Sequence, residues 1–192
     1  YTPETQRFCY AQQENTDLYT RAMWGAYRGF FDVNIQADWV HIDDIADYRI
    51  LYLPYPIMLA EASARALQTW VMAGGTLISE GCPAYFGDRG HVGPVQPNYG
   101  MDVLFGAREA YVEFTPDLLV DLQAQVAGAR VWGGILLQAY DPTTGTVAGT
   151  YADGRVAAVD NACGAGRTRL LGTSAGAGVM GHPDGTSSAF YA

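Results

Sequence analysis

The sequence predicts an α/β fold built on an open, doubly wound and mostly parallel sheet, with a β-rich extension towards the C-terminus. Up to about residue 109, short apolar runs alternate with segments whose apolar residues recur every three or four positions, the pattern of strands alternating with helices. Beyond that point the candidate strands are short and separated by turn signals, as in antiparallel hairpins. The 192 residues, of which 49% are hydrophobic, suffice for one globular domain with a real core.

Three elements are predicted before residue 43. Residues 6–11 predict a first strand, and residues 37–42 predict a second strand. Between them, Asn15 or Thr16 can cap a helix, because the apolar residues that follow share one face. The members of that face are Leu18, Ala22, Met23, Ala26, Tyr27 and Phe30.

The next elements complete the doubly wound part. Residues 49–54 are apolar on both faces, as in a central parallel strand, and Pro54 and Pro56 end the run. Residues 59–73 have helical spacing and are followed by two glycines that stop the helix. Residues 76–79 predict another strand, and the Gly- and Pro-rich stretch 82–100 predicts a long functional or interfacial loop.

Five short candidate strands follow in the second half of the chain. They span residues 110–114, 135–140, 146–151, 155–160 and 167–173. This set is too small to bury a core alone, so we expect it to extend or flank the same sheet. The expected organisation is a single domain over 1–192, with a doubly wound part at 4–109, an antiparallel extension at 110–175 and a terminal segment at 176–192.

The charge and the cysteines limit the possible partners and compartments. A net charge of -9 argues against nucleic acid or an anionic membrane as the main partner, because both attract clustered Lys and Arg. Cys9, Cys82 and Cys163 form neither a disulfide framework nor a CxxC metal knuckle, which favours a reducing, cytoplasmic location. No signal segment opens the sequence and no apolar run approaches the ~20 residues of a membrane span. Because it begins at Tyr1 rather than Met, we expect an excised or N-terminally cut domain.

Cys82 follows the predicted strand 76–79, where α/β hydrolytic enzymes place a nucleophile on a sharp turn. His182 and Asp184 in "GHPDG" are the candidates to complete a Cys, His, carboxylate triad. A nucleophile elbow needs glycine on either side, however, and Glu80 and Ala84 occupy those positions. Pro83 also removes an N–H that an oxyanion hole would use, and the neighbouring Glu80 would raise the thiol pKa. A buried, structural Cys82 is the simpler interpretation.

Two further motifs are weak. Gly176–Gly181 matches the dinucleotide fingerprint, but a βαβ unit and an acidic residue about 20 positions later do not fit in the remaining sequence. A glycine-rich terminal turn is the expected structure, and no cofactor is predicted. His41, Asp43 and Asp44 resemble metal ligands, yet an acidic pair that caps a turn at Ile45 explains them more simply, so no metal is predicted.

Acidic pairs of the kind glycosidases use can be proposed from Glu80, Asp88 or Glu109. A retaining mechanism needs two carboxyl groups about 5 Å apart, and nothing in the sequence places two of these residues at that separation.

Aromatic residues give a more useful signal. Trp24, Tyr27, Phe30 and Phe31 cannot all share one buried stripe of a helix, so some of them face outward or towards another element. Exposed aromatics beside arginines are typical of interface cores, although a large core could also absorb them all. The candidate interface residues are Trp24, Arg28, Phe31, Tyr55, Tyr85, Phe86 and Arg89.

Three longer stretches resemble a known family. They are "YAQQENTDLYTRAMWGAYRGFFDVNIQADWVHIDDI", "YRILYLPYPIMLAEASARALQTWVMAGGTLISEG" and "YADGRVAAVDNACGAGRTRLLGT". Together they resemble the middle, or trimerisation, domain of glycoside hydrolase family 42 β-galactosidases, over about residues 4–175.

The resemblance implies a flavodoxin-like fold related to class I glutamine amidotransferases and a homotrimer in the full enzyme. It also implies a catalytic (β/α)8 barrel elsewhere in the polypeptide, carrying the two catalytic glutamates. A barrel usually needs about 250 residues, so this chain is too short to contain one. We therefore expect a non-catalytic oligomerisation domain whose partners are copies of itself and the barrel of its own polypeptide.

Two other functions stay open from the sequence alone. The first is a cysteine-dependent, glutamine amidotransferase-like hydrolase that uses Cys82, His182 and Asp184. The second is a carbohydrate-binding module, which an exposed coplanar aromatic platform would mark.

Overall fold

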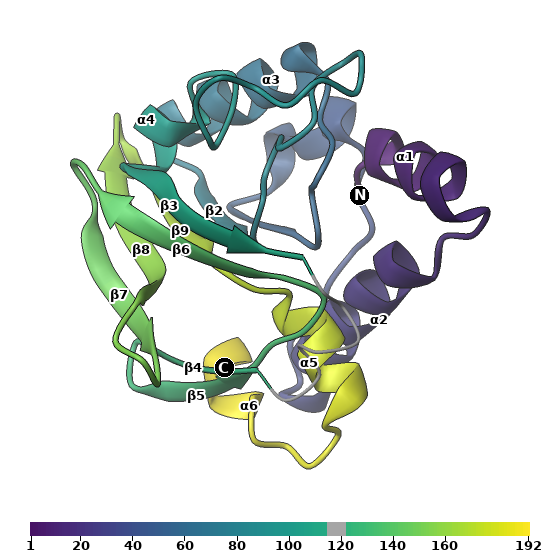
Figure 1. Cartoon of the computed structure of the whole chain (residues 1–192), viewed down its shortest axis with the longest axis vertical. Coiled ribbons are helices and arrows are strands. Elements are labelled where there is room, and N and C mark those ends of the chain that lie inside the picture. The colour runs from purple at the N-terminus through teal and green to yellow at the C-terminus, as the bar shows by residue number, and fades with distance from the viewer. Residues whose placement is uncertain (115–121) are drawn as a thin grey trace.

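The computed structural model describes residues 1–114 and 122–192 (Figure 1). Within these residues the fold is α/β, with a curled seven-stranded mixed sheet and a separate two-stranded sheet. The strand order of the large sheet is β1-β2-β9-β8-β7-β4-β5, so strands from both halves of the chain join one sheet.

Three strands at one end of the large sheet are parallel: β1 (Ile50–Leu53), β2 (Thr76–Ser79) and β9 (Gly166–Leu171). Their apolar side chains alternate between the two faces, as the pleat requires. In β1, Leu51 and Leu53 enter the core on one face, whereas Tyr52 packs on the other.

The remaining strands of the large sheet are antiparallel. β8 (Val156–Cys163) pairs with β9, and β7 (Thr146–Tyr151), β4 (Gln123–Val126) and β5 (Ala129–Trp132) follow in turn. The prediction of a mostly parallel sheet is therefore wrong, because antiparallel pairings outnumber the two parallel ones. β3 (Ala107–Glu113) and β6 (Leu137–Pro142) form the separate antiparallel ribbon.

Helices cover both faces of the parallel strands. α3 (Glu61–Met72) and α4 (Met101–Phe105) lie on one face, and α2 (Asp17–Asp32), α5 (Ala175–Gly181) and α6 (Ser188–Tyr191) lie on the other (Figure 1). The N-terminal α1 (Pro3–Gln13) and the short 3-10 helix η1 (Ile42–Asp47) complete the described elements. None of the described helices is long and apolar enough to cross a membrane.

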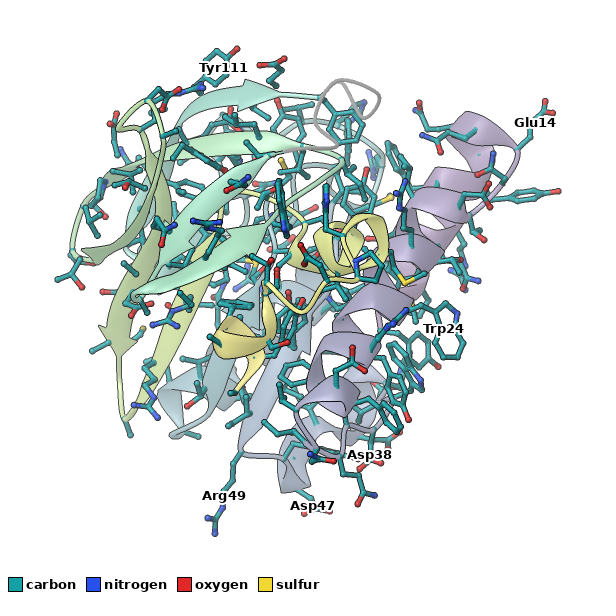
Figure 2. The ribbon with its side chains drawn as sticks, turned by 90° about the horizontal axis from the view of Figure 1, so that it is seen from below. Glu14, Trp24, Asp38, Asp47, Arg49 and Tyr111 are labelled. Atoms are coloured by element: carbon teal, nitrogen blue, oxygen red, sulfur yellow. The ribbon has the colours of Figure 1, made fainter. Side chains whose placement is uncertain are left out.

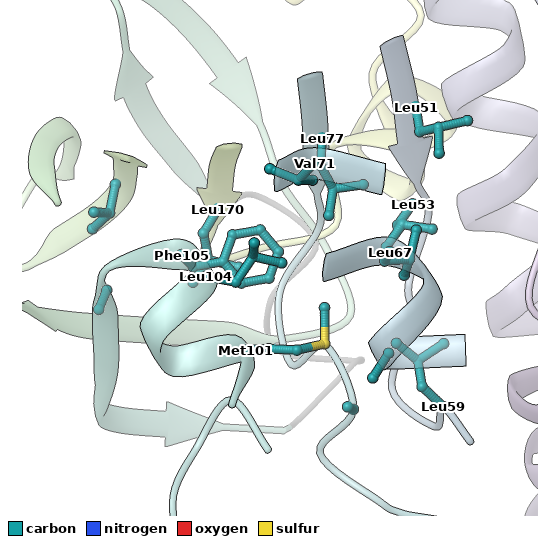
Figure 3. Packing of buried hydrophobic residues seen from close by; sticks show 14 of the residues in the cluster. Leu51, Leu53, Leu59, Leu67, Val71, Leu77, Met101, Leu104, Phe105 and Leu170 are labelled. Carbon is teal, nitrogen blue, oxygen red and sulfur yellow. The ribbon is translucent and has the colours of Figure 1, made fainter. Parts of the chain in front are cut away.

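The larger core lies between the sheet and the α3–α4 layer (Figure 3). Leu67 and Val71 of α3 meet Leu77 of β2, and Phe105 of α4 packs beside Leu170 of β9. All five side chains are at most 1% exposed. This packing explains why the apolar spacing at 59–73 predicted the helix correctly.

The strands predicted at residues 6–11 and 37–42 are absent, so the parallel part of the sheet has fewer strands than expected. Residues 6–11 belong to helix α1, because Pro3 and Glu4 favour a helix start and only Thr5 and Cys9, four residues apart, are buried there. Residues 37–41 are irregular, and His41 caps η1 by accepting a hydrogen bond from the Asp43 N–H at its Nδ1 (3.4 Å).

Several other predicted elements are present in the structure. The helix after Thr16, the strands at 50–53, 76–79 and 146–151, and the irregular loop 82–100 agree with the prediction. The β4–β5 hairpin was not predicted. Residues 175–181 form helix α5, so the expected glycine-rich terminal turn is wrong.

Candidate functional site

Glu80 lies at the carboxyl ends of the parallel strands, directly after β2, and its side chain is fully buried. Its Oε1 accepts hydrogen bonds from the Tyr52 hydroxyl (2.9 Å) and the Gly176 N–H (2.7 Å). Its Oε2 accepts from the Tyr55 N–H (2.9 Å) and the Ser174 hydroxyl (2.6 Å). One carboxylate thus connects the ends of β1, β2 and β9 with the first turn of α5.

The chemistry of Glu80 is that of a structural anchor. Burial raises the pKa of this carboxyl group to about 7, and hydrogen bonds from Ser174, Gly176 and the two tyrosines act in the opposite direction. Fixed donors occupy both oxygens and solvent is excluded. Such a carboxylate holds strand ends together and has no free lone pair directed at a substrate.

Cys82 is buried behind this anchor. Its backbone adopts a left-handed conformation (φ 59°), and its N–H donates to the Gln138 Oε1 at 2.7 Å. Gln138 also accepts from the Tyr140 hydroxyl (2.6 Å) and donates to the Glu109 Oε2 (2.7 Å). Burial, with Glu109 as the second cause, raises the pKa of the Cys82 thiol well above its usual range. A nucleophilic cysteine needs the opposite shift.

The structure places the other two triad candidates in different surroundings. His182 follows α5, where its ring stacks on Trp132 of β5 with centroids 3.8 Å apart. Asp184 is exposed and accepts a hydrogen bond from the Thr186 N–H (2.9 Å). The described residues lining the pocket beside Cys82 include neither His182 nor Asp184. The geometry therefore gives no support to a triad.

The remaining acidic candidates, Glu109 and Asp88, are each held by separate hydrogen bonds. Glu109 is half-buried and bound to Gln138, as described above. Asp88 is exposed and accepts from the Tyr99 hydroxyl (3.2 Å) and the Glu61 N–H (3.1 Å). Each carboxylate serves a local hydrogen-bond network.

Aromatic side chains on and beside α2 form an exposed cluster. Trp24, Tyr27 and Phe31 share the outward stripe of this helix, and Trp39 of the following segment packs against them. Figure 2 shows Trp24 pointing away from the body of the molecule. The exposed fractions are 53% for Trp24, 66% for Phe31 and 42% for Trp39. We call these four residues the α2 aromatic surface.

The rings of the α2 aromatic surface support one another. Tyr27 lies nearly parallel to Trp39 (centroids 5.6 Å, 22°) and to Phe31 (6.4 Å, 19°). Trp24 meets Trp39 edge-on at 6.0 Å. Arg28, on the same side of α2, is half-exposed and pairs with Asp32 at 3.4 Å. The result is an ordered apolar surface with a charged rim.

The opposite face of α2 explains why this surface stays outside. A Cβ on Gly25 would overlap the Gly176 carbonyl of α5, and a Cβ on Gly29 would meet the Tyr191 ring of α6. These glycines let α2 lie flat against α5 and α6. Trp24, Tyr27 and Phe31 lie on the outer side of α2. A groove of about 550 Å³ lies beside them, and Tyr27, Trp39 and Tyr191 help to line it.

The other predicted interface residues are elsewhere. Tyr55 is 2% exposed, so it contributes almost nothing to the outer surface of the chain. Tyr85 and Phe86 are half-buried, and Phe86 stacks on Phe8 of α1 with centroids 4.5 Å apart. Arg89 is exposed in the loop 82–100.

Comparison with known proteins gives the family. The model of the β-galactosidase trimerisation domain matches residues 4–181, most of the chain. The chain belongs to this family. No curated protein sequence gives a significant match.

Solved structures share the fold of this trimerisation domain. A β-galactosidase from Bacillus circulans sp. alkalophilus superposes with a TM-score of 0.73 at 18% identity, covering 90% of this chain and 27% of its own. A β-galactosidase from Halorubrum lacusprofundi gives 0.67 at 24% identity, covering 84% and 25%. An exo-β-1,4-mannosidase from Opitutaceae bacterium strain TAV5 gives 0.67 at 16%, covering 90% and 30%. The chain thus spans about a quarter of the length of these enzymes.

Sequence reasoning missed two parts of the site of this trimerisation domain. Trp39 was assigned to a strand rather than to the α2 aromatic surface. The role of Gln138 was also missed, although a single amide in the apolar run 135–140 is a signal for a buried hydrogen-bond network.

Proposed function

We propose that this trimerisation domain binds copies of itself through the α2 aromatic surface, in a β-galactosidase whose catalytic domain lies outside the printed sequence. The exposure of Trp24 and Phe31 on the outer face of α2, with Trp39 of the following segment packed beside them, carries the proposal. Monomeric proteins rarely expose large contiguous apolar patches, and such patches mark interaction sites. The chain spans only about a quarter of the length of the solved β-galactosidases, which supports a separate catalytic domain.

The composition of the surface suits a binding hot spot. Trp and Tyr are enriched at the centres of interfaces, where a polar rim excludes water from them. Here the ring cluster stands beside the Arg28–Asp32 ion pair, which is half-exposed. Because the rings already pack on one another, little side-chain entropy is lost when a partner covers them.

A closed trimer imposes one further condition on this surface. Three-fold rings use heterologous contacts, in which a patch on one copy meets a different patch on the next. The α2 aromatic surface would therefore contact another region of the neighbouring copy rather than a second α2.

We also infer that the parallel strands β1, β2 and β9 are the part of this fold that is related to flavodoxin-like proteins. Helices on both faces of these strands support that relation, since a doubly wound sheet is covered on both sides. The antiparallel strands β8, β7, β4 and β5 extend the sheet beyond this part.

Sedimentation velocity over a range of protein concentrations tests the proposal. We expect the unmodified chain to self-associate, and Trp24→Ser or Phe31→Ser to weaken association about tenfold or more, as hot-spot residues do. Tyr10→Ser is the matched control, because Tyr10 is a 63% exposed aromatic residue on α1 that does not belong to the α2 aromatic surface. Association that survives both α2 substitutions would reject this surface.

A further inference from the structure

A pocket of about 310 Å³ lies beside the carboxyl ends of β1 and β2. Tyr55 and Cys82, which follow these strands, line it together with Cys9 of α1 and Val112 of β3. Its volume falls in the range of small-molecule sites. Its position is also typical, because open α/β sheets bind ligands outside the carboxyl ends of their parallel strands.

The walls of the pocket are aromatic and uncharged. The rings of Phe8 and Phe86 stack with centroids 4.5 Å apart, and those of Tyr55 and Phe114 stack at 6.3 Å. None of the described lining residues carries a formal charge. Burial raises the pKa of Cys9 to about 11 and raises that of Cys82 as well, so both thiols stay protonated and act as polarisable apolar surface. Such walls favour a neutral, flat ligand.

The Tyr55 hydroxyl supplies a polar group without a partner. Tyr55 is 2% exposed, and its backbone N–H is fixed by Glu80 (2.9 Å). Its hydroxyl makes no hydrogen bond to any residue in the described part of the chain. A hydroxyl of a pocket-lining residue that has no protein partner is a donor available to a ligand. Burial raises the pKa of Tyr55, which keeps the proton on the oxygen.

We propose that this pocket binds an uncharged bicyclic aromatic molecule with one hydrogen-bond acceptor, which the Tyr55 hydroxyl binds. A cavity of about 150 Å³ lined by apolar side chains holds benzene, so about twice that volume accommodates two fused rings. The pocket is lined by residues of α1 and β3, among others, and by none of the α2 aromatic surface.

Quinoline and naphthalene form a matched pair of probes, since they have the same shape and only quinoline carries a ring nitrogen that accepts a hydrogen bond. Ligand-observed NMR near neutral pH measures their affinities. We expect both probes to bind the unmodified chain. Tyr55→Phe should weaken the affinity for quinoline by about two- to tenfold, the effect of one lost hydrogen bond. Naphthalene binding should not change in this variant.

A second measurement locates the bound probe. Quinoline should slow the alkylation of Cys82 and Cys9 but not that of Cys163, which lies at the end of β8, outside the pocket. Val112→Phe, which fills the pocket, should remove the binding of both probes. The proposal is overturned if neither probe binds, if Tyr55→Phe affects both equally, or if alkylation of Cys82 and Cys9 is unprotected.

Discussion

Glu80 connects the ends of three strands at the cost of a buried charge. Desolvation of an ion costs several kcal/mol, and hydrogen bonds must offset it. Glu80 accepts them from two side-chain hydroxyls, Tyr52 and Ser174, and from two backbone N–H groups. At the same edge of the sheet, Tyr55 and Cys82 adopt left-handed backbone conformations (φ 44° and 59°). The Tyr55 N–H is held by Glu80, and the Cys82 N–H is held by Gln138.

Glu80 makes stability depend on pH in a defined direction. Its folded pKa of about 7 lies above its usual value of 4.5, so the folded chain holds this proton more tightly than the unfolded chain. The contribution of Glu80 to the free energy of unfolding is constant below pH 4.5. As the pH rises from there through about 7, that free energy falls by roughly 3 kcal/mol.

Urea unfolding at a series of pH values measures this effect. Glu80→Gln should flatten the fall in stability between about pH 4.5 and 7. Ser174→Ala removes a hydrogen bond that lowers the Glu80 pKa and should therefore deepen the fall. An equal pH slope in all three proteins would refute the assignment.

At the residue scale, the sequence predicted the burial of Cys82 correctly. The absence of flanking glycines favoured a buried, structural Cys82, and the structure shows a buried thiol with a raised pKa. The sequence attributed the raised pKa of the Cys82 thiol to Glu80, whereas burial is the larger cause and the acidic group that adds to it is Glu109, on strand β3. Such contacts between distant segments leave no local signal in the sequence.

At the scale of elements, α2 and α5 form the most closely packed pair among the helices that the structure describes. Gly25 and Gly176 bring the two backbones into contact, where a Cβ on Gly176 would overlap the Ala22 carbonyl. Gly176 of "GAGVMG" therefore serves helix packing. This contact fixes α2 with its aromatic side chains outward.

Gly176→Ala should destabilise the domain by about 1–3 kcal/mol or more, as overpacking does. Gly181→Ala is the control on the same helix, because its added Cβ would lie 3.6 Å from the Arg21 Nη2. Alanine is also the better helix former, so the control should be neutral or slightly stabilising. Urea unfolding compares the two, and equal effects would contradict the packing role.

Helices and strands were predicted correctly where the spacing of apolar residues matches the spacing of buried ones. The prediction failed where few residues are buried and where strand pairing depends on the whole sheet. The helix at 61–72 and the strands at 50–53 and 76–79 pack into the core with the expected spacing. Residues 6–11 have strand-like composition, but only Cys9 among them is buried, so a helix is equally compatible with burial. Pairing partners of the antiparallel strands depend on the whole sheet, which local patterns do not specify.

At the scale of the whole molecule, charge and apolar surface act in opposite directions. The net charge of -9 makes copies of the chain repel one another, whereas the α2 aromatic surface favours contact. Salt screens the repulsion and leaves apolar contact largely intact.

Raising the salt concentration from about 0.02 to about 0.3 M should therefore strengthen self-association. Sedimentation velocity in sodium chloride checks this. Association that weakens with salt would instead indicate ion pairs as the main contacts.

Oxidative footprinting in the monomeric and associated states tests the central claim most directly, because it reports which side chains a second copy covers. We expect Trp24, Phe31 and Trp39 to react several-fold more slowly in the associated state, while the exposed Tyr10 reacts at the same rate in both. An associated state in which Trp24 and Phe31 stay as reactive as in the monomer would contradict the assignment of the α2 aromatic surface as the contact between copies.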